Sequence, residues 1–212
     1  MRELLRGLAF GVVLAAASRA SAEPGRGVWM SAEGQLVVEK RLRLGVEQQL
    51  RLEGPATDFD QTFTELSASY RLTSFLSLGA GYRFIVRADE QRHRGMADAS
   101  LEHAFGPIEL QYRLRGQITT RGDMEPQTVI RNRLSASVDA PYRLAPFAAG
   151  EVHHVVAPAS ELRELRGYLG VDWGVSKAIR LEVFYLYQRE VNVNQPERNH
   201  ILGLGMRYRA RA

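Results

Sequence analysis

The sequence contains no cysteine and almost no lysine. Without cysteine there is no disulfide scaffold, no thiolate metal site and no lipoprotein anchor attached through a thiol. Lysine occurs only as Lys40 and Lys177, so 26 of the 28 basic residues are arginine. The chain has 24 acidic residues as well, which leaves a formal net charge of +4. Charge that is this balanced and scattered is not a basic patch, and we expect no nucleic-acid binding.

Long apolar runs are also missing after the first residues of the chain. The stretch from Leu8 to Ala17 carries no charge, follows Arg2 and Arg6, and precedes Ala20-Ser21-Ala22. A positive start, a short apolar stretch and small residues at a cleavage site are typical of a secretory signal peptide. We therefore expect residues 1–22 to be cleaved and residues 23–212 to form a single domain.

The rest of the chain alternates between apolar and polar residues. From Leu42 to Leu52, even-numbered positions are apolar except Gln48, whereas odd-numbered positions are arginine, glutamate, glutamine or glycine. The same pattern recurs from Ile108 to Ile118. A period of two is the signature of a β-strand with one apolar and one polar face, and no helical period fits. We predict strands over 28–38, 42–52, 62–72, 75–87, 96–105, 108–119, 128–139, 146–155, 165–173, 178–188 and 199–209.

The apolar faces distinguish a membrane barrel from a soluble β-sandwich. On every predicted strand except the irregular 28–38 and 146–155, the apolar face holds no Asp, Glu, Lys or Arg. A sandwich would vary this pattern at its edge strands, and no edge strand is recognisable. Aromatic residues also occur toward the strand ends, as in the interface girdles of membrane barrels: Tyr70, Tyr82, Phe84, Phe105, Trp173, Tyr185, Tyr187 and Tyr208. The sequence therefore predicts an all-β, transmembrane, antiparallel up-and-down β-barrel in the outer membrane of a Gram-negative bacterium.

Connection lengths and strand parity address the orientation and size of the barrel. Short connections (73–74, 106–107, 141–145 and 174–177) alternate with longer ones (53–61, 88–95, 120–127, 157–164 and 189–198). Short turns are usual on the periplasmic side, which predicts a periplasmic C-terminus. Eleven strands would then start outside the cell, and bacterial barrels usually have even strand counts. We expect 10–12 strands, with twelve favoured, because residues 28–41 could split, thread the lumen or leave a ten-stranded barrel.

Several stretches carry a family resemblance. They are Trp29, the TELSASYRLTSFLSLGAGYRF hairpin of 64–84, YRLRGQ at 112–117, IRNRLS at 130–135 and the closing HILGLGMRYR of 200–209. Together they resemble an uncharacterised family of bacterial outer-membrane β-barrels, the domain of unknown function DUF2490, over residues 28–209. The resemblance implies the fold and the outer-membrane location, and no activity. The chain departs from the usual barrel ending, because Arg-Ala-Arg-Ala follows Tyr208.

Histidine, serine and acidic residues offer few candidates for chemistry. His153 and His154 are neighbours on a predicted strand and must point to opposite faces, which disfavours a shared metal ion. A lipase would need a serine beside an outward histidine such as His103 or His154, and a protease could use Asp98 with His93. We expect neither, and predict no catalytic, cofactor-binding or metal-binding residue.

Charged residues on the polar faces are the best functional candidates. Arg113 and Arg115 precede Arg131 and Arg133 on the next strand of one hairpin, so we expect them to be cross-strand neighbours. We predict that the lumen is lined by Arg83, Glu102, Glu109, Arg113, Arg115, Arg131, Arg133, Asp139, Glu151, Asp172 and Glu182. Arginine–carboxylate pairs among them would cross the lumen, with Glu102, Glu109 and Asp139 answering the four hairpin arginines.

Two functions fit such a lumen, and a third is less favoured. The favoured one is a structural or interaction barrel whose lumen is filled by arginine and carboxylate, without enzymatic activity. The alternative is a narrow, porin-like channel for anionic or polar solutes. The third is a barrel hydrolase. The expected partners are outer-membrane lipid and, during biogenesis, the barrel assembly machinery, and we expect a monomer without cofactors.

Overall fold

The computed structural model describes residues 25–54 and 58–212. The signal peptide expected over 1–22 lies outside the described residues. No helix within the described ranges is long and apolar enough to cross a membrane. The described chain forms eleven β-strands and one short 3-10 turn, η1 (Pro141–Arg143). The strands are β1 (Arg26–Val38), β2 (Leu42–Glu53), β3 (Asp58–Arg71), β4 (Leu76–Arg87), β5 (Gln91–Phe105), β6 (Ile108–Arg121), β7 (Met124–Val138), β8 (Leu144–Ala157), β9 (Glu161–Gly174), β10 (Ile179–Glu190) and β11 (Arg198–Arg211).

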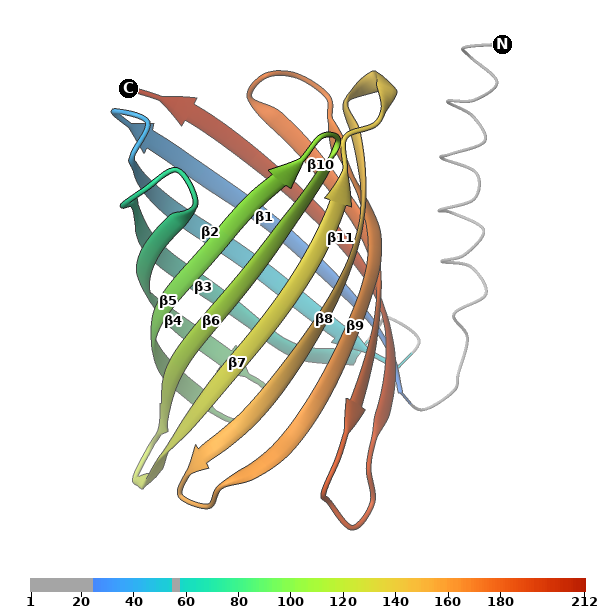
Figure 1. Cartoon of the computed structure of the whole chain (residues 1–212). Helices are drawn as coiled ribbons and strands as arrows, with labels where there is room; N and C mark the ends of the chain where they lie inside the picture. The colour runs from blue at the N-terminus through green and yellow to red at the C-terminus, as the bar shows by residue number, and fades with distance from the viewer. Residues whose placement is uncertain (1–24, 55–57) are drawn as a thin grey trace.

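The strands form one closed, up-and-down barrel in which each strand pairs with its sequence neighbours (Figure 1). The period of two explains this arrangement, because apolar residues cover the outside, and most of the polar and charged residues of the strands point inside. Leu66, Leu134 and Leu169 are 56%, 59% and 62% exposed, as expected for side chains that face lipid. The prediction of an all-β transmembrane barrel is confirmed.

Closure of the barrel brings the first and last strands together. β1 pairs with β11 in parallel, with Ala32 opposite Met206, while all other pairs are antiparallel. An odd number of up-and-down strands leaves the first and last strands pointing the same way, so their pairing must be parallel. The preference for twelve strands is therefore wrong. Residues Arg26–Val38 form one complete strand, and do not split or thread the lumen.

The two ends of the barrel are more alike than the sequence suggests. Strands extend into most of the segments predicted as long loops, so that only residues 88–90, 122–123 and 158–160 connect three of the hairpins. These connections are no longer than those at the other end. The segment 191–197 is the clear exception. The expected contrast between short turns and long loops is thus mostly wrong, and the periplasmic placement of the C-terminus, which depended on it, stays a prediction.

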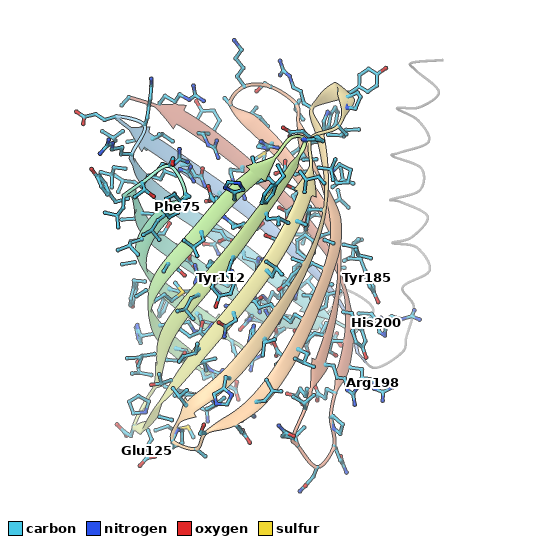
Figure 2. The ribbon with its side chains drawn as sticks, in the orientation of Figure 1. Phe75, Tyr112, Glu125, Tyr185, Arg198 and His200 are labelled. Atoms are coloured by element: carbon cyan, nitrogen blue, oxygen red, sulfur yellow. The ribbon has the colours of Figure 1, made fainter. Side chains whose placement is uncertain are left out.

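The outer surface has aromatic residues toward both ends of the barrel, with Trp173 and Tyr208 at one end and Phe59 at the other. Figure 2 shows Tyr185 and His200 side by side on the outer surface, and the Tyr185 hydroxyl lies 2.5 Å from Nδ1 of His200. Nearer the middle, the Tyr112 hydroxyl donates a hydrogen bond to the Asn132 side-chain oxygen at 2.6 Å. Such pairs satisfy polar atoms that would otherwise face hydrocarbon unpartnered.

We call the end of the barrel where β11 ends the C-terminal end. The buried residues of the molecule lie inside the lumen, in the half farther from this end. Leu186 is fully buried and packs with Tyr168 and Ile201, while Trp29 and Phe184 pack against this cluster. The interior is therefore divided into a densely filled half and a half that opens toward the C-terminal end.

Candidate functional site

The hairpin of β6 and β7 points its arginines into the lumen. Because side chains alternate along a strand, Arg113 and Arg115 share one face of β6, and Arg131 and Arg133 share the same face of β7. The strand register places Arg113 opposite Arg133 and Arg115 opposite Arg131, as expected from the sequence. Four like charges in direct cross-strand contact repel one another unless acids lie between them.

The carboxylates that form ion pairs with these arginines come from the flanking strands β5 and β8. Arg131 lies 2.7 Å from the Glu151 carboxylate of β8, and Arg113 reaches the same carboxylate at 3.9 Å. Arg115 donates hydrogen bonds from Nε and a terminal nitrogen to Asp98 of β5, at 2.5 and 3.0 Å. A bidentate pair of this kind fixes the plane of the guanidinium as well as its position.

The expected partners Glu102, Glu109 and Asp139 do not form this network. Glu102 accepts a hydrogen bond from Gln111 at 2.8 Å. Within residues 25–54 and 58–212, neither Glu109 nor Asp139 forms an ion pair with an arginine. All three lie near the C-terminal end of the barrel, away from Arg131. The carboxylates that complete the network are instead Asp98 and Glu151. Asp98 lies directly opposite Arg115 in the register, whereas Glu151 lies opposite Arg133 and reaches diagonally to Arg131.

The densely filled half of the lumen forms a plug. We use this name for Trp29, Arg51, Phe63, Glu65, Arg83, Arg131, Glu151, Arg166, Tyr168 and Leu186. Arg83 forms an ion pair with Glu65 and stacks over Phe63, with its guanidinium carbon 3.7 Å from the ring centroid. Arg51 stacks in the same way over Trp29, also at 3.7 Å. Cation–π attraction to these rings holds each guanidinium in place inside the lumen.

The plug reaches across the barrel as well as along its wall. Arg166 of β9 lies 5.4 Å from the ring of Trp29 on β1, although β10 and β11 separate these strands. Glu151 is 2% exposed and accepts a hydrogen bond from the Tyr168 hydroxyl at 3.1 Å. Most of these residues were missed from the sequence. Their polar face was recognisable, but which strands they bridge depends on how the barrel closes.

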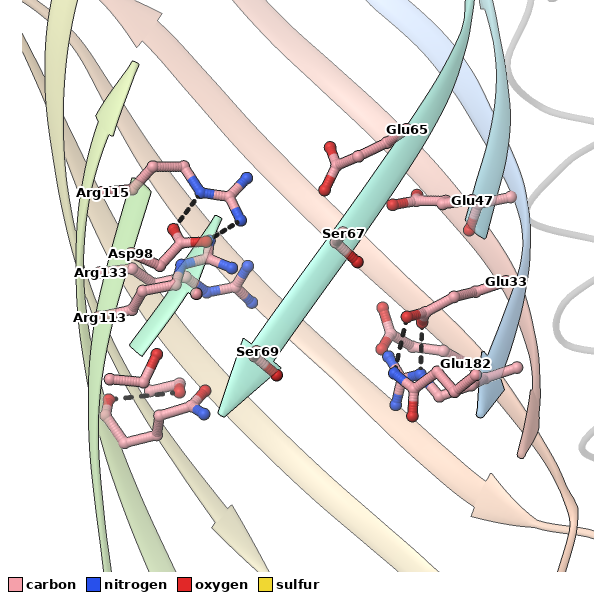
Figure 3. A pocket seen from close by; sticks show the side chains of 18 of the residues that line it. Glu33, Glu47, Glu65, Ser67, Ser69, Asp98, Arg113, Arg115, Arg133 and Glu182 are labelled. Carbon is pink, nitrogen blue, oxygen red and sulfur yellow. Dashed lines mark hydrogen bonds and ion pairs between the residues drawn. The ribbon is translucent and has the colours of Figure 1, made fainter. Parts of the chain in front are cut away.

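The open half of the lumen is a cavity of about 670 Å³, which we call the vestibule. Ten of the predicted lumen residues line it: Arg83, Glu102, Glu109, Arg113, Arg115, Arg131, Arg133, Asp139, Asp172 and Glu182. Glu151 alone of the predicted set is absent from this lining, because it is buried beneath Arg131 in the plug. Figure 3 shows Arg113, Arg115 and Arg133 on one side of the vestibule and Glu33, Glu47 and Glu182 on the other.

Basic residues gather at the C-terminal end of the lumen. A second cavity, of about 520 Å³, adjoins the vestibule and shares Asp139, Ala145, Arg180 and Arg207 with it. The other basic residues that line it are Arg143, Lys177, Arg209 and Arg211. Two of the arginines form ion pairs with carboxylates, since Arg180 lies 2.8 Å from Asp172 and Arg207 lies 2.6 Å from Glu33.

The histidine side chains do not gather at one site. His153 points inward between Glu151 and Glu164, whose carboxylate is 3.2 Å from Nδ1, whereas His154 points outward. Asp98 is held by Arg115 in the lumen while His93 contacts the Tyr82 hydroxyl outside, so the protease pair is not assembled. The described residues hold no group of three His, Asp or Glu side chains that could bind a metal ion.

One contact on the outer surface was missed from the sequence. Nε2 of His154 lies 3.0 Å from the Ser160 hydroxyl in the connection between β8 and β9. This is the serine–histidine neighbourhood that a surface hydrolase requires. In the described part of the chain, no carboxylate holds the other ring nitrogen of His154, so the group that orients a catalytic histidine is missing.

A closed barrel with a lipid-facing apolar surface, aromatic residues toward its ends and a charged lumen is a transmembrane β-barrel. Within this class, the chain belongs to the DUF2490 family, whose model, described as a protein of unknown function, matches residues 26–200. Similar solved structures include a KdgM porin, with 10% sequence identity and a TM-score of 0.47 over 83% of this chain and 96% of that one. No curated protein matches the chain.

Proposed function

We propose that the protein is an outer-membrane barrel of structural or interaction type whose lumen is closed by the plug. It resides in the outer membrane as a monomer, surrounded by lipid, after insertion by the barrel assembly machinery. The plug is the observation that supports this function. A conducting pore needs a continuous water path, whereas Phe63, Glu151 and Leu186 are at most 2% exposed at the level of the plug.

The composition of the plug also favours closure over gating. Leu186, Tyr168 and Ile201 add an apolar cluster to the charged pairs, and such a cluster excludes water. The charged groups are held from several directions, as Glu151 is by Arg131 and Tyr168. A selective pore instead lines its narrowest part with rings of charged side chains or carbonyl groups that an ion can pass. The vestibule then ends blindly at the plug.

Conductance in planar lipid bilayers tests this function. Purified, refolded protein should show little steady conductance at moderate voltage. The double change Phe63→Ala with Arg131→Ala should open a path and raise the conductance. The matched control, Glu102→Ala with Glu109→Ala, removes two vestibule side chains above the plug and should leave the barrel closed. A large, steady conductance in the wild type would overturn the proposal and favour the channel.

Heat-modifiable migration on gels shows whether each variant is folded, since intact barrels run differently before and after boiling.

Location is tested by fractionation, in which the chain should be recovered with the outer membrane. Recovery as a soluble periplasmic protein without detergent would contradict it.

The pair of His154 and Ser160 is the observation that favours a hydrolase. Turnover of phospholipid or peptide that is lost in Ser160→Ala would overturn the non-enzymatic proposal.

A further inference from the structure

The vestibule carries opposite charges on two facing walls. Arg113 and Arg133 come from β6 and β7, whereas Glu47 and Glu182 come from β2 and β10, on the other side of the barrel. Figure 3 shows the two arginines and the two carboxylates on opposite sides of the pocket. Arg113, Arg133 and Glu47 each lie five residues from the strand terminus at the C-terminal end of the barrel, so they occupy a similar level of the cavity.

The charged side chains on both walls form few ion pairs with other residues of the protein. Within the described residues, neither Glu47 nor Glu182 has a basic nitrogen within 4.0 Å. Arg133 stacks over Tyr168, with its guanidinium carbon 4.4 Å from the ring centroid, and forms no ion pair in this part of the chain. The one ion pair of Arg113 is the long contact of 3.9 Å to Glu151.

Neighbouring charged residues of the vestibule, by contrast, are already paired with each other. Arg115 holds Asp98 and Arg207 holds Glu33, each with a hydrogen bond of 2.5 or 2.6 Å. We call the open end of the vestibule the rim. Glu109, near the start of β6, and Asp139, directly after β7, lie on one side of it. The deeper level is therefore where charges of both signs remain available to a ligand.

We infer that the vestibule binds a small zwitterion, whose ammonium group contacts Glu47 and Glu182 and whose carboxylate contacts Arg113 and Arg133. A carboxylate between two guanidiniums, and an ammonium between two carboxylates, form charge-assisted hydrogen bonds in a site partly shielded from water. The volume of about 670 Å³ lies within the range of small-molecule sites. This inference goes beyond the proposed function, because binding above the plug does not depend on whether the plug conducts.

The width of the barrel sets the separation of the two charges in the ligand. With strands about 4.8 Å apart and tilted by about 40°, an eleven-stranded barrel is roughly 22 Å across. Side chains reaching in from both walls leave on the order of 10 Å between the charged groups. Hydrogen bonds of about 2.9 Å at each end leave roughly 4–5 Å for the ligand itself. An extended peptide spans about 3.3–3.6 Å per residue, so a dipeptide with free ends is the shortest peptide that reaches both walls.

Calorimetric titration of dialanine into the refolded full-length chain in detergent tests the inference. The free dipeptide should bind, and capping either end should weaken binding about tenfold, since each cap removes one set of charge-assisted hydrogen bonds. The capped forms are N-acetyl-dialanine and dialanine amide. Absence of binding by the free peptide, or equal binding of all three forms, would overturn the inference.

Paired variants assign each charge of the ligand to one wall. Glu182→Gln should weaken the binding of free dialanine about tenfold and leave that of N-acetyl-dialanine unchanged, because that ligand has no ammonium group. Arg133→Gln should weaken the binding of the free peptide similarly and leave that of dialanine amide unchanged. A misfolded barrel would instead lose all three ligands. Glu109→Gln is the matched control at the rim, and an effect as large as that of Glu182→Gln would move the ligand to the rim and overturn the inference.

Discussion

Arg131 and Glu151 form the most buried ion pair at the centre of the lumen, with 2.7 Å between nitrogen and oxygen. The same carboxylate accepts a hydrogen bond from Tyr168 and lies 3.6 Å from Nε2 of His153. β7, β8 and β9 therefore meet at one side chain, and Glu151 is the residue on which the charge balance of the plug depends. Removing it leaves the guanidinium of Arg131 buried without its carboxylate.

We expect Glu151→Leu to lower the free energy of unfolding by about 3–5 kcal/mol, because an uncompensated charge stays buried. Arg131→Met should have a similar cost. The double variant Arg131→Met with Glu151→Leu should recover much of the stability, since an apolar pair of similar size needs no counter-charge. Urea unfolding of the refolded barrel, followed by tryptophan fluorescence, measures all three. Strictly additive losses would contradict this account of the pair.

The ion pair of Arg180 and Asp172 is the matched comparison. It lies near the C-terminal end, and the Arg180 side chain is 41% exposed. Solvated ion pairs contribute about 0–1 kcal/mol, so Asp172→Leu should be much milder than Glu151→Leu. Equal costs at the two sites would mean that the plug is as wet as the rim.

The facing of side chains predicts opposite responses at adjacent residues. Leu66 is 56% exposed on the outer surface of β3, and Ser67 lines the vestibule. Leu66→Arg should destabilise the folded barrel by about 2–4 kcal/mol near the bilayer midplane. Ser67→Arg places the same charge in a polar lumen and should cost less. Unfolding in lipid vesicles gives both values, and a larger cost at Ser67 would contradict the assigned faces.

The two tryptophans report on the inside and the outside of the barrel. Trp173 is 40% exposed on the outer surface, and Trp29 stacks with Arg51 inside the plug. In vesicles of brominated lipid, Trp29→Phe retains only Trp173, whose fluorescence should be strongly quenched. Trp173→Phe retains only Trp29, which bromine atoms in the acyl chains cannot approach. Strong quenching of Trp29 would show that β1 does not face the lumen as described.

Much of the barrel wall was predictable because a strand pattern is local. The alternation from Leu42 to Leu52 predicted β2 to within a residue, and the arginines of 113–115 and 131–133 predicted the facing of one hairpin. The strands near residues 91 and 124 were predicted too short. Their ends are rich in polar residues, yet they keep pairing with the neighbouring strand beyond the apolar stretch.

The plug was not predictable in the same way. Contacts such as that of Arg166 with Trp29 join strands that are distant in sequence and separated in the barrel wall. Which residues face one another across a lumen depends on strand number and stagger, and the sequence pattern fixes neither. Trp29 and Glu33 make the alternation of residues 28–38 irregular, and what each of them contacts in the lumen depends on the pairing of β1 with β11 as well as with β2.

The parallel pairing of β1 with β11 can be tested by cross-linking, since the chain has no cysteine of its own. Ala32 lies opposite Met206 in the register. Because neighbouring strands are about 4.8 Å apart, cysteines at these positions fall within the range for a disulfide. The double variant Ala32→Cys with Met206→Cys should therefore cross-link on oxidation of the folded barrel, and the product should migrate differently on non-reducing gels. The control Ala32→Cys with Leu202→Cys shifts one cysteine by four residues, roughly 13 Å along the strand, and should not cross-link. An even-numbered barrel would close through an antiparallel pair, so cross-linking in the control instead of the test variant would show that the barrel closes differently.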